Sequence, residues 1–255
     1  MAQLYNADDL MAAYRHLTNA PITEALIDIC VKPSSSVQDA QQLDELCTRL
    51  TDAYPDKKLQ QQFNIEFFPG PPPMERKETR FVGYRLTSSN GLQVIQASPD
   101  KITFSRLRPY QTWEQLREEA QRIWTVYAEI IKPELITRIA TRFINSIEIP
   151  LPMRDFSDYL TAAPSIPEKL PQGISSFFTR VVLPDPTTGA VAIITHALES
   201  VVTPKVVPII IDIDVFIERT FENYERVWTT MDMLRGIKNL IFFESVTEKA
   251  LEPYL

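Results

Sequence analysis

The segment 206–217 is the feature that most restricts the fold of this chain. Its apolar residues occupy every second position, as in a β-strand that packs one face against a core. These residues are Val207, Ile209, Ile211, Ile213, Val215 and Ile217. Asp212 and Asp214 lie on the opposite face of the same strand. The pattern predicts the central strand of an antiparallel sheet with one buried face and one partly polar face.

The rest of the chain alternates between strand-like and helix-like segments. Further strands are predicted at 21–31, 59–68, 80–88, 92–97, 101–107, 136–149, 174–183 and 190–199. Helices are predicted at 7–17, 37–53, 112–131, 155–163 and 220–243, with a short helix or tail after them. Asn90 and Gly91 predict a tight hairpin turn, and Thr112 is expected to cap the helix that follows it.

The order of these elements occurs twice, which predicts a duplicated α+β fold. Thr112-Trp113-Glu114-Gln115 and Thr220-Phe221-Glu222-Asn223 have the same pattern at the start of the two long helices. We therefore expect an N-terminal helix within residues 1–20, a first α+β repeat at 21–132, and a second at 133–255 that includes the C-terminal helices. Each repeat would contain a strand, a helix, three or four strands and a long helix.

This order of elements resembles the TATA-binding-protein-like and helix-grip-like folds. The resemblance implies curved antiparallel sheets with long helices on one face and a concave face left available. The chain also resembles a sporadically distributed family of uncharacterised bacterial proteins over nearly its whole length. The residues that carry this second resemblance are Pro21-Ile22-Thr23-Glu24-Ala25, Phe104-Ser105, Tyr110, Trp113, Arg138 through Arg142 to Asn145, Asp212-Ile213-Asp214 and Phe243-Glu244-Ser245-Val246-Thr247. It implies one full-length member and carries no activity with it.

Composition narrows the classes of function. The chain has 255 residues, of which 44% are hydrophobic and 23% charged, as in ordinary globular proteins. Its net charge of −7 argues against nucleic-acid binding through phosphates. It has only six glycines, and no phosphate loop, dinucleotide fingerprint or nucleophile elbow occurs. We therefore expect no cofactor and favour a binding protein over an enzyme.

The cysteines and the apolar segments predict a cellular location. Cys30 and Cys47 are typical of free thiols in a reducing compartment. The sequence shows no secretory leader and no apolar run near the ~20 residues that a membrane helix needs. We expect a soluble, cytoplasmic protein without a membrane partner.

Four charged residues form the main candidate site. Arg138 and Arg142 share one face of the strand predicted at 136–149, and they are expected to pair with Asp212 and Asp214. Such a group would line a polar pocket on the concave sheet, where the arginines would hold a small anionic ligand or a protein partner. Asn145 has the opposite parity on its strand and joins this face only if a bulge intervenes.

Two alternatives remain open at this stage. Asp212 and Asp214, with Asp28 or Glu24 as a third ligand, would form the metal site of a metal-dependent hydrolase or nuclease. The protein would otherwise be a structural subunit of a homo-oligomer, because unpaired edge strands allow association, for instance as a homodimer.

Overall fold

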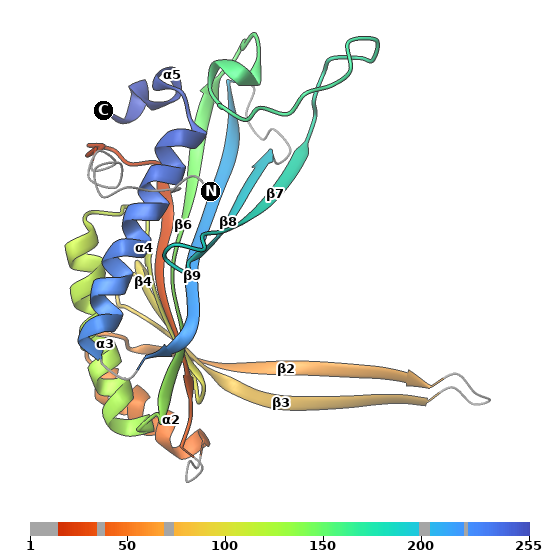
Figure 1. Cartoon of the computed structure of the whole chain (residues 1–255). Coiled ribbons are helices and arrows are strands. Elements are labelled where there is room, and N and C mark those ends of the chain that lie inside the picture. Colours follow the sequence, from red (N-terminus) through yellow and green to blue (C-terminus); the bar gives the residue numbers. More distant parts are fainter. Residues whose placement is uncertain (1–14, 35–38, 69–73, 199–204, 222–223) are drawn as a thin grey trace.

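The computed structural model describes residues 15–34, 39–68, 74–198, 205–221 and 224–255. Within these residues one antiparallel sheet of nine strands carries the long helices on one of its faces (Figure 1). The strands are β1 (Ile22–Lys32), β2 (Asp56–Phe68), β3 (Met74–Thr87), β4 (Gln93–Ser98), β5 (Lys101–Leu107), β6 (Leu135–Pro150), β7 (Phe177–Pro184), β8 (Val191–Leu198) and β9 (Val206–Phe221). The helices are α2 (Asp39–Leu50), α3 (Trp113–Ile131), α4 (Tyr224–Ser245) and α5 (Glu248–Leu251), with 3₁₀ turns η1 (Phe156–Asp158) and η2 (Glu252–Tyr254). The α+β class and the antiparallel sheet predicted from the sequence are confirmed.

The strands lie in the order β2-β3-β4-β5-β1-β6-β9-β8-β7. The middle strand is β1, with four strands on either side of it. The segment predicted to be central is β9, which lies inside the sheet between β6 and β8 but not at its middle. β6 pairs with it in antiparallel register over most of its length and β8 over Ile209–Phe216, which accounts for its regular alternation.

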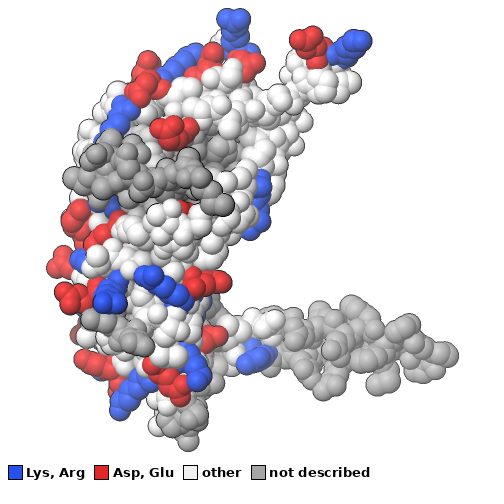
Figure 2. Space-filling view, in the orientation of Figure 1, with Lys and Arg blue, Asp and Glu red and all other residues white. Residues whose placement is uncertain are grey.

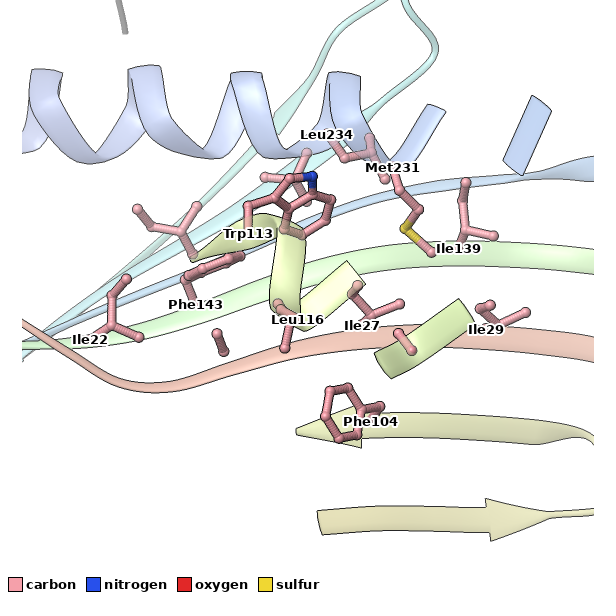
Figure 3. Close-up of a cluster of buried hydrophobic side chains, with 14 of the residues drawn as sticks. Ile22, Ile27, Ile29, Phe104, Trp113, Leu116, Ile139, Phe143, Met231 and Leu234 are labelled. Atoms are coloured by element: carbon pink, nitrogen blue, oxygen red, sulfur yellow. The ribbon is translucent and has the colours of Figure 1, made fainter. Parts of the chain in front are cut away.

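The core fills the space between the sheet and the helices, and Figure 3 shows its middle. Side chains from β1, β5 and β6 meet side chains from α3 and α4 there. Buried members are Ile27, Ile29, Phe104, Trp113, Leu116, Ile139, Phe143, Met231 and Leu234. Each fully buried side chain of this size contributes about 1.5–3 kcal/mol by leaving water, so this layer holds the helices on one face. The opposite face of the sheet is left uncovered by them (Figure 1).

The two long helices begin differently. Thr112 caps α3 as expected, because its hydroxyl accepts a hydrogen bond from the Gln115 amide at 3.2 Å. The start predicted for α4 at Thr220 is wrong. β9 continues to Phe221, which pairs with Ile136, and α4 begins at Tyr224. Strand pairing therefore overrides the local capping pattern: Thr220 and Phe221 belong to a strand, whereas Thr112 and Trp113 begin a helix.

A β-hairpin leaves the sheet at Gly83 and projects from the body of the molecule (Figure 1). β3 pairs with β4 only over Tyr84–Thr87, whereas it pairs with β2 along its whole length. We call the projecting part, residues 61–68 and 74–83, the arm. A Cβ atom at Gly83 would lie 2.0 Å from the carbonyl oxygen of Ala97. Only glycine therefore fits where the arm departs.

Several other sequence predictions differ from the structure or fall outside the described residues. The helix predicted at 155–163 is only the 3₁₀ turn η1, whose start Asp155 caps by accepting from the Ser157 amide at 2.7 Å. Most of the helix predicted at 7–17 lies outside the described residues, and residues 15–20 contain no helix. Strands of the two predicted repeats join in one sheet, because β1 pairs with β6.

Candidate functional site

A network of ion pairs crosses four neighbouring strands on the face of the sheet that the helices leave open. At its centre, Arg138 on β6 reaches Asp28 on β1 at 2.8 Å and Asp214 on β9 at 3.4 Å. Arg142, also on β6, forms a forked pair with Asp212 on β9, with N···O distances of 2.8 and 2.5 Å. Antiparallel pairing of β6 with both β1 and β9 brings these side chains together.

Asp28 is the most enclosed carboxylate of the network. The hydroxyl of Thr103 on β5 donates to it at 2.5 Å, and the ammonium of Lys101 lies 2.9 Å away. Asp28 retains only 8% of its exposure. A carboxylate at this depth is stable because several donors replace its lost water.

Burial and neighbouring charges perturb the titration of this network. Burial raises the pKa of Asp214, and the carboxylates of Asp28 and Asp212 act in the same direction, whereas the two arginines oppose it. The hydrogen bonds to Asp212 raise the pKa of Arg142. Arg138, Arg142 and Lys101 thus face Asp28, Asp212 and Asp214, and the exposed Glu218 lies 3.8 Å from Arg138 at the margin of the network. The positive and negative charges therefore nearly balance.

The network lines a hollow of about 340 Å³ on the open face. Gln60 and Val82 of the β2–β3 hairpin form one wall, while Arg138, Arg142 and Asp214 lie on the floor. Figure 2 shows charges of both signs spread over the convex side of the molecule. The size of the hollow falls at the lower end of the range for ligand pockets.

The structure brings together the four predicted residues Arg138, Arg142, Asp212 and Asp214. Asn145 lies elsewhere, and its inclusion with them is wrong. β6 contains no bulge between Arg142 and Asn145, so Asn145 keeps its opposite parity and faces the helices. It is buried there, and its amide donates to the carbonyl of Ile211 at 3.0 Å.

Sequence reasoning missed two members of the network, Lys101 and Thr103. Both lie on the polar face of a strand predicted at its observed bounds, and Ile102 and Phe104 alternate with them. The alternation therefore contained the signal. The sequence does not show which strand lies beside this one, and only the pairing of β5 with β1 places Thr103 opposite Asp28.

The alternative metal site lacks a suitable set of ligands. Asp28 and Asp214 both contact the guanidinium of Arg138, and Asp212 is held by Arg142. Across the described ranges, no three His, Cys, Asp or Glu side chains are grouped so that they would hold a metal ion. The carboxylates that would coordinate a cation are instead neutralised by arginines.

No protein-family model matches the chain, and no curated protein matches it in sequence. Of the helices in the described part of the chain, none has the length and apolar character needed to cross a membrane.

Proposed function

We propose that the protein is a binding protein that holds a protein partner on the open, concave face of its sheet. The observation that carries this proposal is the charged network in an accessible hollow beneath the arm. Both arginines are already paired with carboxylates of the chain. A small anion would have to displace these partners, whereas a protein surface can add contacts around them.

Apolar side chains beside the network support a macromolecular partner. Pairing across β9, β8 and β7 places Asp214, Ile193 and Val182 in one row on the open face. Phe178 shares the face of Val182 on β7, and the two side chains are 68% and 46% exposed. Exposed apolar groups next to charged ones are typical of protein interfaces.

We further propose that the chain is a duplicated unit with a TATA-binding-protein-like arrangement. What supports this is the strand order: β5, β4 and β3 follow β1 outward on one side, and β9, β8 and β7 follow β6 outward on the other. A long helix follows β5 in the first half and β9 in the second. β2 has no counterpart among the described strands. The two halves would then share one continuous binding face.

The experiment that tests partner binding compares two arginines in matched surroundings. Arg142 and Arg122 are each 45% exposed, and each forms a forked ion pair within the chain. Arg122 lies on α3, on the opposite side of the sheet. Tagged wild type, Arg142→Ala and Arg122→Ala are used to capture partners from the lysate of the source cells, followed by quantitative mass spectrometry.

We expect to find a protein that wild type and Arg122→Ala capture in similar amounts. Arg142→Ala should capture roughly tenfold less of it, as for the loss of a charged interface contact. Melting curves of all three proteins verify that they are folded. Identical capture by wild type and a folded Arg142→Ala would remove the basis of the proposal.

A further inference from the structure

A second pocket lies on the other side of the sheet, between the start of α3, the middle of α4 and β6. Its volume is about 150 Å³, which is room for on the order of ten water molecules. Trp113, Asn145 and Lys238 contribute to its walls. Asn145, which the sequence analysis had assigned to the open face, thus lines this separate pocket.

Lys238 is the unusual residue of this pocket. It projects from α4 and is only 6% exposed. Its ammonium lies 3.9 Å from the centre of the Phe143 ring. No carboxylate of the described residues forms an ion pair with it, and the nearest charge that affects it is that of Arg235, which is also positive. A cation at this depth is costly unless an anion accompanies it.

The acid that precedes Lys238 on α4 is engaged elsewhere. Asp232, six residues earlier, accepts from the indole of Trp113 at 2.7 Å and lies 3.2 Å from Arg117. Glu114, in the first turn of α3, is the carboxylate that lines the pocket, whereas Arg15, Arg235 and Lys238 line it as cations. Arg15 is already paired with Glu248 at 2.6 Å, so it is the buried ammonium of Lys238 that calls for an anion.

The remaining walls are aromatic and polar. Tyr110, Trp113, Phe242 and Phe243 line the pocket. The Phe143 ring, which is not part of the lining, supports two of them: it meets Tyr110 edge to face at 5.6 Å and lies 6.5 Å from Trp113. The first residues of α3 also line the pocket, and the amide groups at a helix start favour negative charge. A flat, apolar body would pack against the rings, with its charged end directed toward Lys238.

We propose that this pocket is a binding site for a small planar organic anion, whose charged group pairs with the buried ammonium of Lys238. The anion supplies the counter-charge that the protein does not provide, and the rings of Tyr110, Trp113 and Phe242, which line the pocket, enclose its apolar part. This site is independent of the open face and of the proposed partner.

The test measures binding of 4-fluorobenzoate to the full chain by ¹⁹F NMR, with the uncharged 4-fluorobenzamide as the matched ligand. The variants are Lys238→Met, which preserves most of the side-chain volume, and Lys249→Met as the control. Lys249 is a half-exposed lysine paired with Asp158 outside the pocket. Lys238→Gln provides a second uncharged side chain if the methionine variant does not fold.

We expect wild type and Lys249→Met to bind the benzoate with a dissociation constant of roughly millimolar, as for a ligand of this size. Lys238→Met and Lys238→Gln should bind it tenfold to about a hundredfold more weakly, as for loss of a charged hydrogen bond. The benzamide should bind wild type at least roughly tenfold more weakly than the benzoate does. Equal affinity of wild type and folded Lys238 variants for benzoate, equal affinity for the two ligands, or no saturable binding to wild type would each overturn the proposal.

Discussion

Replacing Lys238 with methionine should change how the stability of the protein depends on pH. Burial lowers the pKa of Lys238 from its ordinary 10.5 to about 7, and the positive charge of Arg235 contributes. Between these two values the unfolded chain binds more protons than the folded one, so the stability of wild type rises with pH across this window. Lys238 is nearly fully enclosed, so solvent screens this effect little.

The magnitude follows from the two pKa values. Protonation of Lys238 in the unfolded chain lowers stability by about 2 kcal/mol near pH 9 and by about 5 kcal/mol near pH 6, both relative to strongly alkaline solution. Methionine is of similar length and has no charge to bury. The stability advantage of Lys238→Met over wild type should therefore increase by about 2–3 kcal/mol between pH 9 and pH 6.

Urea unfolding of both proteins at the two pH values, followed by tryptophan fluorescence, measures this difference. The buffers should contain neither carboxylate nor phosphate, because an anion in the pocket would stabilise the charged lysine. Tyr110, Glu114, His16 and Arg235 also line the pocket, and their contributions largely cancel because both proteins contain them. If the free energies of unfolding of wild type and Lys238→Met changed with pH in parallel, the pKa of Lys238 would be the same in the folded and unfolded states. That result would refute the reasoning.

Two further substitutions test the fold and the ion-pair network. Gly83→Val should destabilise the protein by more than about 2 kcal/mol in urea unfolding, because its Cβ would meet the backbone 2.0 Å away. A Cβ at Gly173 meets no atom within 4 Å, so Gly173→Val should change stability little. Equal effects would refute the steric argument. Arg138→Met leaves two largely buried carboxylates without their shared partner and should cost about 2 kcal/mol or more. Arg122→Met breaks an exposed pair and should cost at most about 1 kcal/mol. A similar loss of stability in both arginine variants would mean that burial does not strengthen the ion pairs of the network.

Alternation along the strands made much of the fold and site predictable. Arg138 and Arg142 lie four apart, and Asp212 and Asp214 two apart, so each pair must share a face of its strand. That these two faces meet depends on β6 pairing with β9, which follows from the fold and not from either segment alone. The parity rule also argued against Asn145, and the structure follows the rule.

Other features depend on tertiary contacts that local patterns do not contain. Thr220 is a good helix cap by composition, but the pairing of Phe221 with Ile136 extends the strand past it. Lys238 follows Leu234 by four residues and precedes Phe242 by four, so helical spacing places it on the buried stripe of α4. A lysine within such a stripe is a detectable signal. Its significance becomes clear only when the surrounding side chains, and the absence of an ion-pair partner among the described residues, are known.

Because β3 leaves the main sheet at Gly83, the length of the arm and the packing of the core can change independently. Beyond this residue the backbone of β3 pairs with β2 alone, so no strand of the main sheet constrains the length of the arm. Insertions of residue pairs would lengthen the ribbon without shifting the register of the strands that hold the helices. The molecule can therefore adjust its reach toward another surface while the core remains as it is.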